Sequence, residues 1–190
     1  MDVMRHLPNA ITALRFLLIP VLVVLLLQRC YEAAFAVFVI SALSDLVDGM
    51  LARLWNARTR LGAIADPAAD KLTMLATTLA LASEHLVPLW LAVAIVARDV
   101  LIVGGAIAYH FIVGRVEMTP SWLSKGNTVL EFVTLSAVLA DAAGVIDIPV
   151  LPQLFVLLLA TIIASGAHYV WVWGRRALNA RRAAPSAADR

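Results

Sequence analysis

Residues 45–70 read DLVDGMLARLWNARTRLGAIADPAAD, which places four aspartates in a chain that is otherwise strongly apolar. Carboxylates within an apolar, membrane-spanning segment are costly, so their presence points to a function. Hard divalent cations prefer oxygen ligands, and carboxylates gathered without a cation would repel one another. The stretch therefore predicts a divalent-cation site, built from Asp45, Asp48, Asp66 and Asp70.

The composition places this stretch in a membrane protein. The chain has 190 residues, of which 62% are hydrophobic, and a mean hydropathy of +0.89, whereas soluble domains contain about 45–50% apolar residues. A spanning helix needs about 20 mainly apolar residues. We therefore predict an all-α integral membrane protein with six transmembrane helices, over residues 8–28, 32–54, 62–83, 86–111, 122–142 and 149–173.

The loop charges predict the orientation of these spans. Most of the 15 Lys and Arg residues lie at the termini and in the second and fourth connections, and such an excess marks the cytoplasmic side. We therefore expect a multi-pass protein with both termini and the active site facing the cytoplasm, in a bacterial inner membrane. The spans form one domain, residues 1–178, and we expect the polar tail 179–190 to be disordered. No basic face with interleaved aromatic residues supports nucleic-acid binding.

The spacing of the aspartates predicts that they converge. The first pair is three residues apart and the second pair four, so each pair lies on one helical face. A short loop joins the two spans as antiparallel neighbours, and the carboxylates meet in a cavity open to the cytoplasm. The alternatives are helix caps, ion pairs with Arg53 or Lys71, and a divalent cation transporter. A transporter would need a polar route to both faces, whereas these acids cluster toward one side.

The pattern Asp-x2-Asp-Gly-x2-Ala-Arg-x8-Gly-x3-Asp-x3-Asp over residues 45–70 resembles the signature of the CDP-alcohol phosphatidyltransferase family, with no departure at any defined position. The resemblance implies transfer of a phosphatidyl group from CDP-diacylglycerol to an acceptor hydroxyl, with release of CMP. It also implies a homodimer and one or two divalent ions, Mg²⁺ or Mn²⁺, held by the four aspartates. Asp70 is the expected catalytic base as well. The expected contacts to the nucleotide and pyrophosphate are Gly49, Ala52, Arg53, Thr59 and Gly62.

Three basic residues bear on the acceptor. Arg15 lies inside the first predicted span and needs an anionic partner. Arg98 lies in the fourth span, where it either faces an acceptor phosphate or pairs with its neighbour Asp99. Lys125 lies at the start of the fifth span, where it either binds the acceptor or extends to the membrane surface. Arg98 and Lys125 together predict an anionic glycerol-type acceptor, and Arg15 is a third candidate contact to it.

Two stretches bear on which acceptor is used. Residues 97–102 (ARDVLI) and 124–128 (SKGNT) most resemble the eukaryotic-type cardiolipin synthases, which favours phosphatidylglycerol. Glycerol 3-phosphate, the acceptor of the phosphatidylglycerol-phosphate synthases, is the alternative. Glu131 stands where both branches often carry Gln.

Overall fold

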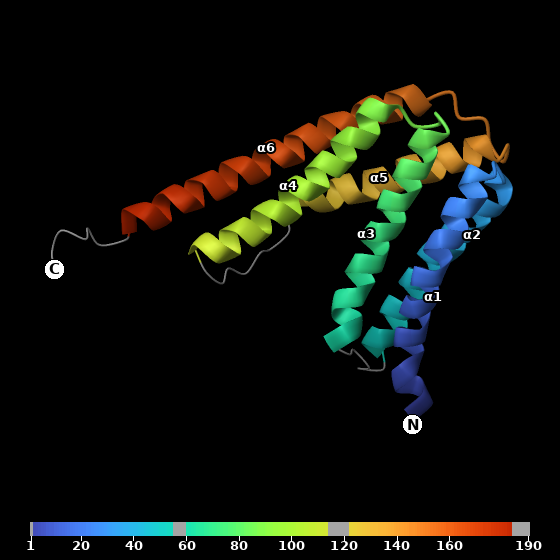
Figure 1. The fold of residues 1–190 in the computed structure, drawn as a ribbon, viewed down its shortest axis with the longest axis horizontal. Coiled ribbons are helices and arrows are strands. Elements are labelled where there is room, and N and C mark those ends of the chain that lie inside the picture. Colours follow the sequence, from blue (N-terminus) through green and yellow to red (C-terminus); the bar gives the residue numbers. More distant parts are fainter. Residues whose placement is uncertain (1, 55–59, 114–121, 184–190) are drawn as a thin grey trace. The chain divides into compact units, whose positions relative to one another are not determined.

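The computed structural model describes the backbone of residues 2–54, 60–113 and 122–183, and the side chains of residues 13–44, 68–105, 122–172 and 175. Over these residues the chain forms six α-helices and no strand, as the apolar runs predict (Figure 1). The helices are α1 (Asp2–Leu27), α2 (Tyr31–Leu54), α3 (Arg60–Ser83), α4 (Leu89–Val113), α5 (Trp122–Ala142) and α6 (Leu151–Ala183).

Most helix ends lie within a few residues of the predicted boundaries. α1 begins earlier, at Asp2, and α6 continues past residue 173 and past Asn179 to Ala183. Both extensions are rich in polar or charged residues, which a search for apolar spans passes over. Arg, Ala, Leu and Met are nevertheless strong helix formers, so each helix extends beyond its apolar part.

The ends of α1, α3 and α5 share one geometry. Arg29, His85 and Gly144 follow these helices with φ values of 60°, 60° and 67°. The next backbone N–H in each case donates back across the last turn, over 2.9–3.0 Å. This Schellman motif satisfies helix carbonyls that would otherwise lack a donor. For α3 it lies at the end opposite the acidic signature.

The described helices fall into two compact units. The first unit, Met1–Ala92 with Phe132–Leu151, contains α1, α2, α3 and the second half of α5. α1 packs against both α2 and α3, and Figure 1 shows the three running alongside one another. Phe38 of α2 stacks on Phe132 of α5 with ring centroids 5.3 Å apart. The buried apolar side chains of this unit include Leu22, Leu26, Leu81, Leu135 and Leu139.

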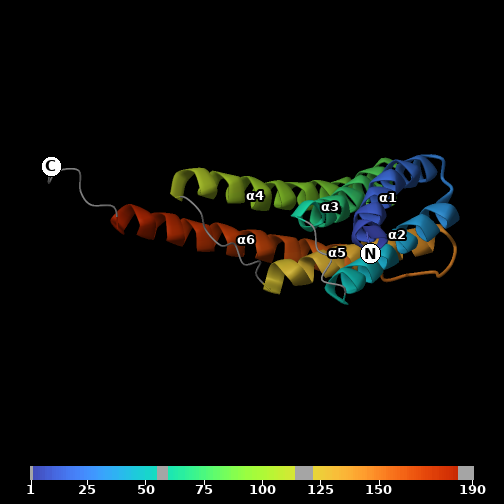
Figure 2. The same cartoon turned by 90° about the horizontal axis from the view of Figure 1, so that it is seen from below.

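The second unit, Val93–Glu131 with Pro152–Arg190, contains most of α4, the first half of α5 and most of α6. Ile95, Leu158 and Ile162 are buried in it. Side-chain hydrogen bonds join α5 to both of the other helices, and Figure 2 shows the first half of α5 alongside α6. Polar contacts as well as apolar packing therefore hold this unit together.

The helices expose many apolar side chains. Within the described residues, one stretch, Leu151–Val172, is long and apolar enough to cross a membrane, and two apolar stretches, Ala13–Leu27 and Tyr31–Ser44, are shorter. Large apolar residues are exposed on every helix, including Leu17, Leu43, Leu79, Val100, Val129 and Val156. Six membrane spans therefore remain a prediction.

Candidate functional site

The acidic signature occupies the last turns of α2 and the first turns of α3. Asp45 and Asp48 lie in α2, and Asp66 and Asp70 lie in α3, so both pairs have the helical backbone that the spacing requires. The side chains of the first three lie outside the described residues. The side chain of Asp70 is described and is half-buried.

The predicted nucleotide contacts fall in the same two helices. Gly49, Ala52 and Arg53 lie in α2 and Gly62 lies in α3, but their side-chain positions, and the whole of Thr59, lie outside the described residues. No group of three or more His, Cys, Asp or Glu side chains that could hold a metal occurs within the described part of the chain. Because that part contains only one of the four predicted ligands, the metal site and the nucleotide contacts remain predictions.

A small cavity lies beside Asp70, inside the first unit. Its volume is about 10 Å³, and its polar walls are Arg15 of α1, Ser41 of α2, and Asp70 and Thr73 of α3. That volume suits about one water molecule. Ser41 lies one helical turn before Asp45, and Thr73 lies just under one turn after Asp70. The structure therefore brings α2 and α3 together next to the predicted cation site.

The polar walls of this cavity are deeply buried. Arg15 is 2% exposed, and Ser41 and Thr73 are also buried. The Thr73 hydroxyl donates to the Ala69 carbonyl over 2.9 Å, which leaves its oxygen able to accept. Apolar residues close the other sides, namely Phe38, Ala42, Met74 and Phe132. Charges in such a water-poor place interact strongly.

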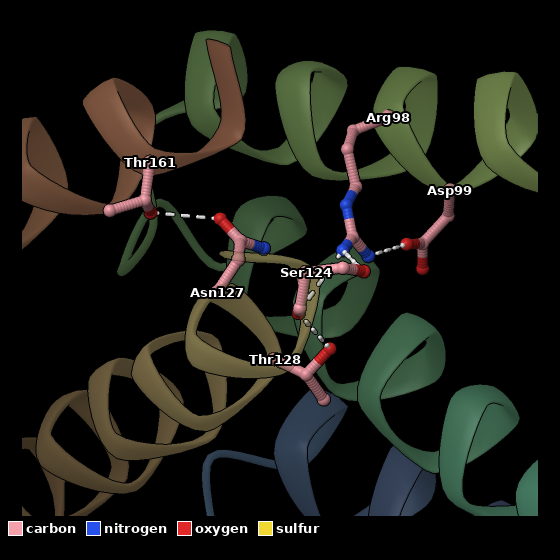
Figure 3. Close-up of polar contacts among 6 residues, drawn as sticks. All are labelled: Arg98, Asp99, Ser124, Asn127, Thr128 and Thr161. Carbon is pink, nitrogen blue, oxygen red and sulfur yellow. Dashed lines mark hydrogen bonds and ion pairs between the residues drawn. The ribbon is translucent and has the colours of Figure 1, made fainter. Parts of the chain in front are cut away.

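The second unit holds a polar cluster around Arg98, shown in Figure 3. Arg98 Nη1 donates to Asp99 Oδ1 over 2.7 Å, and Nη2 donates to Ser124 Oγ over 2.7 Å. The pairing with Asp99, one of the two alternatives drawn from the sequence, is therefore present. Arg98 is 5% exposed. Its Nε is buried and makes no hydrogen bond to any residue that the structure describes.

The other predicted acceptor residue, Lys125, lies in an exposed position. It follows Ser124 directly, and its ammonium lies 5.0 Å from the centroid of the Trp122 ring. A cation over a tryptophan face is attracted by the ring quadrupole. Arg98 therefore lies inside the second unit, whereas Lys125 lies at the surface of that unit. Ser124, which Arg98 contacts, is the residue before Lys125.

Two polar contacts of the second unit were not predicted from the sequence. Thr161 of α6 donates to Asn127 Oδ1 of α5 over 2.8 Å, and Asn127 is 1% exposed (Figure 3). Ser124 accepts from Arg98, as described above. The signal for Ser124 and Asn127 was the polar run at residues 124–128. Thr161, a single hydroxyl within an apolar run, gave no comparable signal.

Comparisons with known proteins agree with the acidic signature. A family model described as CDP-alcohol phosphatidyltransferase matches residues 5–175. The cardiolipin synthase (CMP-forming) of Homo sapiens is 28% identical over 185 residues, covering 89% of this chain and 62% of the relative. A cardiolipin synthase/mitochondrial hydrolase fusion protein of Schizosaccharomyces pombe is 33% identical over 187 residues, covering 86% of this chain and 30% of the relative.

A second kind of relative also matches. The CDP-diacylglycerol–glycerol-3-phosphate 3-phosphatidyltransferase of Salmonella choleraesuis is 34% identical over 137 residues, covering 69% of this chain and 75% of the relative. The chain spans less than two thirds of the length of the cardiolipin synthases named above. The names of the first kind of relative give cardiolipin as the product, whereas the name of the second gives glycerol 3-phosphate as the acceptor.

Proposed function

Because the chain belongs to the CDP-alcohol phosphatidyltransferase family, we propose that it transfers the phosphatidyl group of CDP-diacylglycerol to the hydroxyl of an anionic glycerol-type acceptor and releases CMP. The observation that carries this proposal is the complete family signature at residues 45–70. The signature lies on two helices that line a common cavity at Asp70.

The donor set fits a divalent cation. It consists of carboxylates alone, carried by α2 and α3 of one unit, and oxygen-only donors suit Mg²⁺ or Mn²⁺. Asp45, Asp48, Asp66 and Asp70 would hold one or two such ions. When bound, the cation neutralises pyrophosphate charge and polarises the phosphorus.

The residues of the signature have separate roles in the proposed reaction. Asp70 takes the proton of the acceptor hydroxyl as the oxygen attacks the lipid-linked phosphorus. The bond from phosphorus to the CMP oxygen breaks, and CMP leaves. The small residues Gly49, Ala52 and Gly62 admit the nucleotide. Arg53 contacts the pyrophosphate with its planar fork, and Thr59 adds a hydroxyl contact.

For the acceptor we favour phosphatidylglycerol, so that the product is cardiolipin. Arg98 supports an anionic acceptor, because its guanidinium is held by Asp99 and Ser124 while Nε keeps a donor to offer. Lys125 adds positive charge at the neighbouring surface, and Arg15 is a third candidate contact to the acceptor. Glycerol 3-phosphate is the second candidate, favoured by the 34% identity to the Salmonella enzyme.

We further propose that the enzyme spans the membrane six times. The exposed apolar side chains on all six helices favour a lipid surround, and the loop charges favour cytoplasmic termini. The active site would then face the cytoplasm, in a bacterial inner membrane. We expect a six-span domain over residues 1–178, a polar tail from residue 179, and a homodimer, as the family resemblance implies.

Purified protein in lipid vesicles tests the proposal. With CDP-diacylglycerol, Mg²⁺ or Mn²⁺, and either anionic acceptor, we expect release of CMP that stops when the cation is chelated with EDTA. Restoring the cation restores the release. Absence of CMP with both acceptors would contradict the proposed activity, and release that persists in EDTA would contradict the cation requirement.

A further inference from the structure

We infer that Arg15 is a positioning residue for Asp70 and does not bind the acceptor. The inference rests on the proposed function, in which Asp70 is the base, and it assigns a different role to Arg15 from that expected from the sequence. Arg15 lies in α1 and Asp70 in α3, two helices that pack against each other in the first unit. Both side chains line the same small cavity.

The burial of Arg15 requires a local source of negative charge. The residue is 2% exposed, and a guanidinium removed from water is stable only near an anion or several acceptors. Between Asp2 and Glu32 the sequence contains no acidic residue. Among the described residues that line the cavity, Asp70 is the acidic one. We therefore assign the compensation of the Arg15 charge to Asp70, the candidate base, which lines the same cavity.

The cavity volume favours a positioning role for Arg15 over a role in acceptor binding. At about 10 Å³ the space holds about one water molecule, whereas a glycerol phosphate group is several times larger. The stacked rings of Phe38 and Phe132 form part of its wall and close it on the side of α2 and α5. The cavity as it stands is therefore too small for an acceptor phosphate, whereas one water would fit between Arg15 and Asp70.

The Ser41 and Thr73 hydroxyls complete this arrangement. Both belong to the same cavity wall, and the Thr73 hydroxyl points its hydrogen at Ala69. Its oxygen is then left to accept from Arg15 or from a bridging water. A guanidinium held in this way fixes the direction from which it approaches Asp70. Orientation of a reacting group by an outer partner is a known requirement of cation-dependent sites.

Steady-state kinetics distinguish a positioning role from acceptor binding. We expect Arg15→Gln to lower kcat about 10- to 100-fold, as loss of an outer-shell partner does, with the acceptor KM nearly unchanged. Arg15→Lys keeps the charge and should recover part of the loss. Arg98→Gln is the comparison variant, and it should raise the acceptor KM instead. A raised acceptor KM with unchanged kcat in Arg15→Gln would overturn the assignment while leaving the proposed function intact.

A double-mutant cycle in thermal stability provides a readout that needs no activity. Arg15→Gln and Asp70→Asn each remove one of two opposite charges, and coupled residues have non-additive effects. We expect the fall in Tm of the double variant to be smaller than the sum of the two single falls. Additive falls would overturn the assignment. A wild-type protein that releases no CMP but shows the non-additive Tm would overturn the proposed function and leave the Arg15–Asp70 coupling standing.

Discussion

Two of the arginines whose side chains the structure describes are buried in the helices, and their surroundings differ. Arg98 of α4 is held by Asp99, the next residue along the chain, and by Ser124 of α5. Arg15 of α1 lies instead at a cavity that it shares with Asp70 of α3. The first environment is largely local, whereas the second depends on the packing of α1 against α3.

This difference separates two tasks in the proposed reaction. A guanidinium neutralised by its own neighbour is fixed in place yet keeps a donor, Nε, for a ligand. A guanidinium that shares a cavity the size of one water with a carboxylate is better placed to orient that carboxylate than to bind a ligand. We therefore expect substitutions around Asp70 to affect turnover, and substitutions around Arg98 to affect acceptor affinity.

Asp70→Asn provides the largest expected effect. Removal of a general base lowers rates by about 10²–10⁴-fold, so CMP release should fall at least about 100-fold while CDP binding is retained. Release of CMP and calorimetric binding of CDP measure the two effects. Asp147→Asn, in the exposed connection after α5, is the matched control and should retain activity. Near-normal turnover in Asp70→Asn would show that Asp70 is not the base.

Arg98→Gln tests the other side of the comparison. Hydrogen bonds to charged groups contribute about 1.5–3 kcal/mol, so the acceptor KM should rise roughly 10- to 100-fold with a smaller change in kcat. Arg29→Gln removes an exposed arginine that pairs with Glu84 and should leave both constants unchanged. A lowered kcat with an unchanged acceptor KM would show that Arg98 acts on turnover, as Arg15 is expected to do, and does not bind the acceptor.

Ser124→Ala should have the same kind of effect as Arg98→Gln, but a smaller one. It removes the 2.7 Å contact to Arg98 Nη2 and leaves the ion pair with Asp99. A single hydrogen bond contributes about 0.5–1.5 kcal/mol, which corresponds to a roughly 2- to 10-fold rise in acceptor KM. Ser136→Ala is the control, because the Ser136 hydroxyl donates to a carbonyl of its own helix. Its acceptor KM should be unchanged. Equal acceptor KM values for Ser124→Ala and Ser136→Ala would show that Ser124 does not contribute to acceptor binding.

The smallest effect concerns stability. Thr161→Val removes the hydrogen bond from α6 to Asn127 of α5 while keeping the side-chain shape. Side-chain bonds between helices in membranes contribute about 0.6 kcal/mol on average, so Tm should fall by a small but measurable amount. Thr77→Val removes only a bond within α3, and its Tm should fall less. A larger fall in Thr77→Val would show that the contact between α5 and α6 contributes little.

The sequence predicts the helices because each one is encoded locally. Apolar runs predict the six helices. The three- and four-residue spacings of the aspartates predict that each pair shares one face of its helix, α2 or α3. The Arg98–Asp99 pair is also accessible from sequence, because its members are adjacent. The helical extensions at Asp2 and Ala183 are missed because they are polar, although their residues favour helix.

Contacts between distant residues are not predicted in this way. The Phe38–Phe132 stack and the Thr161–Asn127 bond join residues far apart in the chain, and no periodicity specifies which helix faces which. The cavity beside Asp70 likewise combines residues from four helices. The sequence shows that Arg15 needs an anion, but only the packing of α1 on α3 places Asp70 at the same cavity.

The most direct test of the proposed function offers labelled phosphatidylglycerol and labelled glycerol 3-phosphate side by side, with CDP-diacylglycerol and Mg²⁺ or Mn²⁺. We predict CMP release accompanied by label in cardiolipin. Label in phosphatidylglycerol phosphate instead would keep the phosphatidyltransferase and replace the favoured acceptor by the second candidate. No labelled product and no CMP from either acceptor would contradict the proposed function.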